Sequence, residues 1–452
     1  MIASVTRCRS AAPPAAVPSG AMAPHDTWNE TVAFRSGRPL LSFAVERDSL
    51  VLYEGMQVMK FFFDDESFSF EALRTAGYST YGGAELGEVL VTLRQIPEGD
   101  DEAWSAQWAA TAARVEGFGR DSLAGEHRVS ARDALLRASN YYRVADFYRR
   151  ADPTNDAESA RLARASRQTF ADAVALFDTP VRAVRIPYEG TTLPGYLFLA
   201  DDSGEPRPTV IFHGGFDSTL EEGYFALAAG ALRRRYNVLA FDGPGQGTAV
   251  REQGLRFRPD WEAVVSPVVD FALAQPEVDD NQVVLIGMSL GGYLAARAAA
   301  FEHRLAACVL FDGLYDPHGV LDAPFKAAAG HPGGLEALMA EDIGARWMIQ
   351  NGLWTFGVST ADDFRTASEA YTVEGIADKI TCPTLVLSGE NDQFAAGQPE
   401  RVFDALRCQK ELITFPENEG GGEHCQEGAI GLFHQRTFDW LDGVLTASAA
   451  ER

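Results

Sequence analysis

The residues most able to do chemistry in this sequence surround a serine at position 289. Residues 287–291 follow the pattern G-x-S-x-G, with an aliphatic run at 283–286 before it and a helix-forming run at 293–300 after it. A buried strand that turns sharply into a helix exposes the serine Oγ, and glycines are needed there because a Cβ would collide with neighbouring backbone. The pattern predicts that Ser289 is a nucleophile. The alternative is a glycine-rich turn with an incidental serine.

A serine nucleophile needs a base to accept its proton and an acid to orient that base. In strand–turn–helix sites of this kind the chain order is serine, acid, histidine. Asp392 follows an aliphatic strand and is the predicted acid, with Glu390 as a close rival and Asp312, after the preceding strand, as a weaker one. His424 lies in a loop after three glycines, before the last helix, and is the predicted base. The alternatives are a solvated or helix-capping carboxylate and a surface-loop histidine.

An oxyanion hole requires two backbone N–H groups, and Leu290, directly after the nucleophile, would supply the first. The second is expected from residues 213–218, which read H-G-G-F-D-S after the apolar strand 209–212. Paired glycines let the backbone approach a substrate closely, so Phe216 or Gly215 is the predicted donor. The loop resembles the HGG-type oxyanion loop of esterases and lipases.

A second glycine-rich loop, residues 242–247, also follows a strand. Its G-x-G-x-G pattern is compatible with phosphate binding, but Pro244 and the missing lysine favour a tight structural turn. We therefore predict no cofactor. The cysteines lack C-x-x-C spacing, which predicts free thiols in a reducing cytoplasm and no metal site; they are Cys8, Cys308, Cys382, Cys408 and Cys425.

Composition narrows the classes of partner. The chain has 452 residues, is 46% hydrophobic and carries a formal net charge of −25, which disfavours nucleic acid and anionic membranes and favours neutral or cationic small molecules. No apolar run has the length of a membrane span. Residues 1–26 are rich in Ala, Pro and Ser, and prolines interrupt their only apolar segment, so we expect a disordered extension and not an export signal. Met22 is an alternative start to Met1.

Alternating strand and helix patterns predict an α/β fold with a mostly parallel twisted sheet covered by helices. The expected strands are 181–187, 193–199, 209–212, 237–241, 282–286, 306–311, 384–387 and 411–415. The expected helices of this core are 220–235, 261–274, 289–301, 398–406 and 427–445. Before the core, irregular pieces at 34–63 and helices at 103–117, 130–150 and 157–177 indicate a mainly helical lid region. We predict a lid region at 27–178, a core at 179–313 and 381–452, and a helical cap insertion at 314–380.

The chain resembles a family of α/β-hydrolases with an extended N-terminal helical region. This family includes 2,6-dihydropseudooxynicotine hydrolase and the fungal pigment polyketide-shortening (yellowish-green type) hydrolases. The similarity covers most of the chain from about Gly82 onward. It is carried by residues 82–88, Trp104, Trp108, and residues 142–148, 213–218, 287–292, 380–392 and 423–426.

The resemblance implies hydrolysis of a carbon–carbon bond in a ketone or β-diketone, with Ser289, Asp392 and His424 as the triad. It also implies an additional acid in the oxyanion loop, at Asp217, and a homodimer. The nicotine-degrading relative has glutamate at that position, so aspartate shifts the expected substrate toward a polyketide of secondary metabolism. Asp217 and His213 are the predicted substrate-binding residues.

Several alternatives remain at the level of sequence. Expelling an enolate needs a positioned proton donor or carbonyl activation, and Asp217 with a raised pKa would donate, or would bind a substrate hydroxyl or amine. Equally, Asp217 would cap a helix beginning near Thr219. The same triad would also serve an esterase, a lactonase, an acyltransferase or a cyclase. A non-catalytic binding protein that retains the fold is a further alternative.

Overall fold

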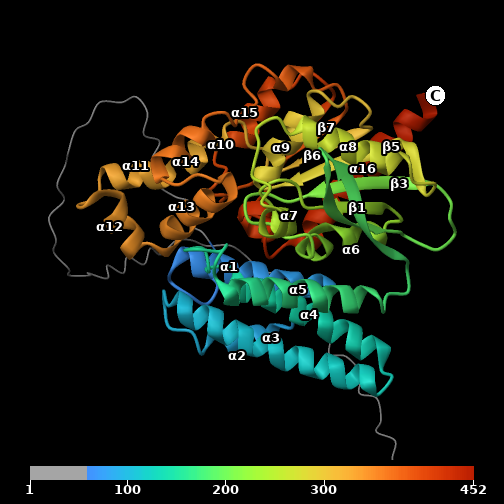
Figure 1. Cartoon of the computed structure of the whole chain (residues 1–452). Helices are drawn as coiled ribbons and strands as arrows, with labels where there is room; N and C mark the ends of the chain where they lie inside the picture. Colours follow the sequence, from blue (N-terminus) through green and yellow to red (C-terminus); the bar gives the residue numbers. More distant parts are fainter. Residues whose placement is uncertain (1–58, 452) are drawn as a thin grey trace, which may run out of the picture. The chain divides into compact units, whose positions relative to one another are not determined.

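The computed structural model describes residues 59–451, and an eight-stranded sheet forms its core (Figure 1). The strand order is β1-β2-β4-β3-β5-β6-β7-β8. Strands β1 and β2 form an antiparallel hairpin, β2 pairs antiparallel with β4, and all other pairs are parallel. The bounds are β1 Val181–Tyr188, β2 Thr191–Phe198, β3 Arg207–His213, β4 Asn237–Phe241, β5 Val278–Met288, β6 Ala307–Phe311, β7 Thr384–Gly389 and β8 Lys410–Phe415. The predicted extension 1–26, with Met22, and most of the irregular stretch 34–63 lie outside the described residues.

Burial on both faces explains why the central strands read as continuous apolar runs. Successive side chains point to opposite faces of a strand, so neighbouring residues enter different cores. Leu239 and Leu285 pack in one apolar core with helices α8 (Glu262–Leu273) and α9 (Leu290–Ala299). Val238 and Val284 pack in the other core, with α16 (Ile430–Glu451). The predicted α/β class is thereby confirmed.

Within residues 59–451, five α-helices precede the sheet and pack around a third apolar core. They are α1 Glu66–Gly77, α2 Leu86–Leu93, α3 Asp101–Ala124, α4 Arg128–Asp146 and α5 Ala157–Val174. Trp104 and Trp108, one turn apart on α3, are fully buried in this core, and the Trp104 indole donates to the Val144 carbonyl at 2.9 Å. These two tryptophans, four residues apart on one face of the helix, are therefore core residues.

A helical insertion separates β6 from β7, as the sequence predicts for 314–380. It contains α10 Pro317–Leu321, α11 Ala323–Ala329, α12 Gly334–Glu341, α13 Ile343–Phe356 and α14 Ala361–Ser368. Helix α13 lies beside α1 (Figure 1). Trp347 of α13 stacks on Phe147 with ring centroids 4.6 Å apart and donates from its indole to the Phe147 carbonyl at 2.8 Å. The insertion and the N-terminal helices are therefore in direct contact.

One predicted helix differs from the structure. The sequence predicts one regular helix over 220–235, and residues 222–232 are helical, but a π-helical turn, η2 Tyr224–Ala228, interrupts the helix before the short α6 Ala229–Leu232. Just before this turn, Glu222 accepts a hydrogen bond from Arg74 Nε of α1 at 2.8 Å. The other core helices are α7 Gly247–Gln253 and α15 Gln398–Ala405. Among residues 59–451, no helix has both the length and the apolar character needed to cross a membrane.

The strand-to-helix turn after β5 depends on glycine. A Cβ on Gly287 would lie 2.0 Å from the Gly291 carbonyl oxygen, which is backbone and cannot rotate away. We expect Gly287→Ala to lower the free energy of unfolding by about 3 kcal/mol. The matched control is Gly443→Ala in α16, where a Cβ meets nothing within 4 Å; helix propensity should there raise stability by about 0.5–1 kcal/mol. Chemical denaturation measures the free energy of unfolding of both variants. Equal changes in the two variants would contradict the prediction.

Candidate active site

Ser289 occupies a strained bend between β5 and α9. Its φ is 62° and its ψ is −126°, a conformation that residues with a side chain rarely adopt. Its N–H donates to the Phe311 carbonyl at 2.7 Å, and its own carbonyl accepts from the Gly292 N–H at 2.7 Å. The predicted context, a strand before the serine and a helix after it, is confirmed. The turn holds the hydroxyl at the N-terminus of α9.

The imidazole of His424 connects Ser289 to a carboxylate. Its Nε2 lies 2.8 Å from Ser289 Oγ, and its Nδ1 lies 2.7 Å from Asp392 Oδ2. We assign the tautomer in which Nδ1–H donates to Asp392 and Nε2 accepts from the serine hydroxyl, because a carboxylate can only accept. The rings of Phe70 and Phe394 lie at 6.2 and 5.1 Å from the imidazole centroid. The three predicted triad residues therefore meet, with aromatic rings beside the base.

The two acids in the loop after β7 have different partners. Asp392 Oδ1 accepts the backbone N–H groups of Phe394 and Ala395 at 2.8 and 2.9 Å, which aims Oδ2 at the imidazole. Glu390, the close rival in the sequence, instead accepts the N–H of Glu417 at 2.7 Å. The loop geometry therefore favours Asp392 over Glu390.

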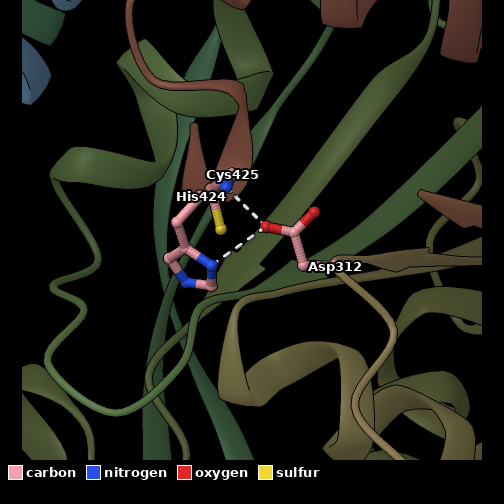
Figure 2. A group of neighbouring side chains, drawn as sticks. All are labelled: Asp312, His424 and Cys425. Carbon is pink, nitrogen blue, oxygen red and sulfur yellow. Dashed lines mark hydrogen bonds and ion pairs between the residues drawn. The ribbon is translucent and has the colours of Figure 1, made fainter. Parts of the chain in front are cut away.

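Asp312 places a second carboxylate at the same imidazole nitrogen (Figure 2). Its Oδ2 lies 3.1 Å from His424 Nδ1 and accepts the Cys425 backbone N–H, and its Oδ1 accepts from Gln426 Nε2 at 3.2 Å. Asp312 is fully buried, and its φ of 48° is accompanied by φ values of 53° at Cys425 and 47° at Gln426. The sequence ranked Asp312 as the weaker rival, but the structure brings both aspartates to His424.

These charges shift the pKa values of the site. Burial acts to lower the pKa of His424, but the charge of Asp392 and the hydrogen bonds of both aspartates outweigh it and hold that pKa well above 6.5. Burial acts to raise the pKa of Asp312, but the hydrogen bond and charge of His424 and the Cys425 N–H lower it overall. Burial raises the pKa of Asp392, and the neighbouring Asp312 charge adds to this effect. The site thus stabilises the imidazolium, which is the form of His424 after it has accepted a proton.

The predicted oxyanion loop lies against the serine turn. A Cβ on Gly215 would be 2.8 Å from the Leu290 nitrogen and 3.0 Å from Ser289 Cβ, and a Cβ on Gly291 would be 2.6 Å from the Gly214 carbonyl oxygen. Glycine is therefore required on both sides of this contact. Leu290 is the first residue of α9, so its N–H is one of the free donors of that helix.

His213 lies behind the oxyanion loop. Its ring is completely buried, with the rings of Phe241 and Trp261 at 5.5 and 5.6 Å, and burial lowers the pKa of His213 to about 4. The ring is neutral and enclosed, and its Nδ1 lies 3.1 Å from the Gly214 carbonyl oxygen of the loop. This position does not favour the substrate contact that the sequence analysis assigned to His213.

Asp217 is ion-paired, which reverses one expectation. Arg74 of α1 donates from Nη1 to Asp217 Oδ2 at 2.6 Å, and also bonds Glu222 at 2.8 Å and Glu71 at 3.0 Å. Burial acts to raise the pKa of Asp217, but the charge and hydrogen bond of Arg74 lower it overall, so the carboxyl is an anion and not the proton donor considered above. Residue 219 is not helical either, so Asp217 caps no helix there.

Arg74 itself was missed, because a single arginine in an amphipathic helix carries no motif. The buried charge cluster around it comprises Glu71, Arg74, Arg143, Asp217, Glu222 and Glu427. Glu427 is fully buried with its Oε1 3.3 Å from the Tyr78 hydroxyl. Burial, with smaller contributions from Glu222 and Glu71, raises the pKa of Glu427 to about 8. Burial thus favours the protonated form of Glu427 in the folded protein, although the charge of Arg74 acts in the opposite direction.

One group of side chains has metal-ligand chemistry. Asp312, His424 and Cys425 each offer one ligand atom, and these atoms lie within 4.8 Å of one another (Figure 2). Such a donor set would suit Zn²⁺ only with a thiolate. Burial raises the pKa of the Cys425 thiol well above 9, and His424 Nδ1 is already bonded to Asp392. The chemistry of the donors therefore fits a hydrogen-bonded base better than a metal ligand.

Fold and site together define a class of protein. The chain belongs to the alpha/beta hydrolase family, whose family model matches residues 209–427. It is a hydrolase of this superfamily, and the family predicted from the sequence motifs is confirmed.

Particular relatives match most of the chain. Hydrolase acrC of Aspergillus aculeatus is 37% identical over 421 residues, covering 84% of this chain and 97% of the relative. The 20-hydroxy-prefusarin hydrolase FUS2 of Gibberella moniliformis is 36% identical over 410 residues, with 84% and 97% coverage. The crystal structure of 2,6-dihydroxy-pseudo-oxynicotine hydrolase superposes with a TM-score of 0.67 at 24% identity, covering 82% of this chain and 96% of that chain. The last likeness shows a shared fold.

The raised pKa of Glu427 makes stability depend on pH. The folded state holds this proton up to about pH 8, whereas an unfolded glutamate releases it near 4.5. Unfolding in this interval releases a proton, so the free energy of unfolding should fall by roughly 1.4 kcal/mol per pH unit as pH rises. Glu427→Gln is neutral at every pH and should lose this part of the slope, becoming more stable than wild type at pH 8 but not at pH 4.5. Urea unfolding measures this difference in the free energy of unfolding between the two proteins. If the difference is the same at pH 4.5 and at pH 8, the assignment is contradicted.

Proposed function

We propose that this protein is a serine hydrolase that cleaves a carbon–carbon bond beside a ketone, through an acyl-enzyme. The observation that carries the proposal is the continuous hydrogen-bonded line from Ser289 Oγ through His424 to Asp392, at 2.8 and 2.7 Å. A serine, a base and an orienting acid within these distances form the arrangement that activates a hydroxyl.

In the proposed reaction, Ser289 Oγ attacks the ketone carbonyl while its proton passes to His424 Nε2. The N–H of Leu290 and that of Phe216 or Gly215 stabilise the oxyanion. Collapse of this intermediate breaks the carbon–carbon bond, and its electron pair enters the leaving fragment as an enolate, which takes the proton from His424. Water then attacks the acyl-enzyme with His424 as base, releasing a carboxylic acid and regenerating Ser289.

The surroundings favour an apolar ketone of the polyketide or β-diketone type as substrate. Partly exposed Phe70 and Phe394 flank the base, and Phe216 lies among other aromatic rings, stacked on Phe257 and Phe364. The net charge of −25 disfavours anionic substrates. The relative FUS2 is named a hydrolase of 20-hydroxy-prefusarin, which supports a related class of ligand here.

Asp217 is proposed to bind a substrate hydroxyl. It borders two cavities, one of them shared with Arg150, Phe216 and Asn351, and as an anion it accepts hydrogen bonds. Because Asp217 is an anion paired with Arg74, it cannot donate a proton. It can accept a hydrogen bond from a hydroxyl or an amine of the substrate. Ester or lactone hydrolysis and acyl transfer by the same triad are the alternatives, since triad geometry serves each of them.

The bond that is cleaved can be tested by assaying an aryl ester and a β-diketone on three proteins. Ser289→Ala should abolish turnover of both. Asp217→Asn should lower kcat/KM for a hydroxylated β-diketone by about tenfold, the value of one charge-assisted hydrogen bond, and should leave the ester almost unchanged. Product analysis by mass spectrometry checks that the diketone gives a carboxylic acid and a ketone. Dominant ester turnover together with an unaffected Asp217→Asn variant would remove the basis for carbon–carbon cleavage.

The pH profile tests the base. Only neutral His424 can accept the serine proton, so kcat/KM should fall as pH falls through its raised pKa, with an acid limb above pH 6.5. Asp392→Asn and Asp312→Asn each remove one carboxylate and should move this limb to lower pH. We expect Asp392→Asn to cost less than the roughly 10,000-fold loss common for a triad acid, because Asp312 still accepts from Nδ1. An acid limb that stays in place in both variants would exclude His424 as the base.

A further inference from the structure

Three successive carbonyls of the oxyanion loop, those of residues 214–216, accept hydrogen bonds from side chains. Gln246 Nε2 donates to the Gly214 carbonyl at 2.6 Å, and Ser218 Oγ donates to the Gly215 carbonyl at 3.3 Å. Asn351 Nδ2 donates to the Phe216 carbonyl at 3.0 Å. A peptide unit is planar and trans, so its C=O and N–H point in opposite directions. The donors to the Gly214 and Gly215 carbonyls therefore set the directions of the Gly215 and Phe216 N–H groups, which are the candidate oxyanion donors. Gln246 Nε2 also lies 3.4 Å from the Gly215 carbonyl oxygen. Asn351 holds the next peptide unit, whose N–H belongs to Asp217.

Gln246 belongs to the glycine-rich loop 242–247, which the sequence analysis left without a function. Its side chain is almost fully buried, and its Oε1 accepts the Gly243 N–H at 2.9 Å. This bond fixes the orientation of the amide. In the opposite orientation Oε1, an acceptor, would face the Gly214 carbonyl oxygen, which is also an acceptor. Within this loop, Gly243 packs against the Trp261 ring so closely that its Cβ would lie 2.6 Å away. These contacts therefore hold the loop and the Gln246 side chain in a fixed position.

Asn351 reaches the oxyanion loop from the insertion. It lies on α13, is almost fully buried, and its Oδ1 accepts from Arg150 Nε at 3.1 Å. Arg150, just after α4, is anchored in turn to the Asp146 carbonyl at 2.7 Å. A hydrogen-bonded line thus runs from the N-terminal helices through the insertion to the Phe216 carbonyl. The two regions outside the sheet contribute to the geometry of the oxyanion loop and not only to the walls around the substrate.

We propose that Gln246 is a positioning residue that aims the Gly215 and Phe216 N–H groups of the oxyanion loop at the reacting carbonyl, and that Asn351 assists it by holding the next peptide unit of the loop. This inference rests on the proposed serine mechanism. It assigns to both side chains an effect on the transition state, because the oxyanion exists only after the carbonyl is attacked. Ground-state binding of the substrate should be affected much less.

The chain contains a matched control for Asn351. Asn140 is equally buried, its Nδ2 donates to the Gly83 carbonyl at 2.9 Å, and its Oδ1 accepts from Arg143 Nε at 3.1 Å. Both asparagines therefore join an arginine to a backbone carbonyl, but Asn140 does so away from the oxyanion loop. Changing either to aspartate keeps a partner for the arginine and removes the donor to the carbonyl.

The experiment compares Asn351→Asp, Gln246→Met and Asn140→Asp with wild type. We expect Gln246→Met to lower kcat by about 10- to 100-fold, somewhat less than deletion of an oxyanion donor, with KM changed less than about twofold. Asn351→Asp, which acts on the neighbouring peptide, should lower kcat by a smaller factor. The inhibition constant of an aryl trifluoromethyl ketone, which forms the oxyanion with Ser289, should weaken by the same factor as kcat/KM falls. Asn140→Asp should change neither quantity, although its thermal midpoint should fall as far as that of Asn351→Asp.

The proposal is overturned if Gln246→Met lowers kcat no more than Asn140→Asp, or if kcat/KM falls while the inhibitor binds as before. Should Gln246→Met fail to fold, Gln246→Glu decides the matter, since it removes the donor to the Gly214 carbonyl and keeps an acceptor for the Gly243 N–H. Ser289→Ala separates this failure from failure of the serine mechanism. Full activity of Ser289→Ala would reject the mechanism, whereas an inactive Ser289→Ala beside a fully active Gln246→Met would reject only the positioning role.

Discussion

The structure depends on one imidazole held between a hydroxyl and two carboxylates. His424 reaches Ser289 through Nε2 and both Asp392 and Asp312 through Nδ1. These groups follow β5, β6, β7 and β8, neighbouring parallel strands whose carboxyl ends meet at one edge of the sheet. Sheet order therefore brings together residues that are far apart in the chain. Two carboxylates at one buried nitrogen are costly to bury unless the ring carries charge, which is the state that proton transfer produces.

The second constraint is a cluster of buried charges between the N-terminal helices and the core. Arg74 on α1 bonds Asp217 beside the oxyanion loop and Glu222 in the segment that follows. One turn earlier on the same helix, Phe70 lies beside the His424 imidazole. A buried arginine without its acids would be strongly destabilising, so this cluster fixes how α1 packs on the core. The N-terminal helices are in this way part of the site.

The oxyanion loop shows how a backbone site is specified by side chains. Glycines at 214, 215 and 291 allow the two backbone segments to touch, but they do not determine which way a peptide points. Hydrogen bonds to the carbonyls constrain that direction: Gln246 in the core donates to the Gly214 carbonyl, and Asn351 in the insertion donates to the Phe216 carbonyl that follows. Donors on rigid, buried elements need no reorganisation when charge develops on the substrate.

The sequence by itself determined the local features: the α/β class, nearly all strand positions, the serine turn and the histidine loop. These follow from hydrophobic periodicity and glycine placement, which act over a few residues. Only the tertiary structure decided the electrostatics. It showed that Asp312 joins Asp392 at His424, that Arg74 makes Asp217 an anion, and that His213 is enclosed. A pKa and a buried pairing depend on which side chains converge from distant segments, and spacing along one chain does not contain that information.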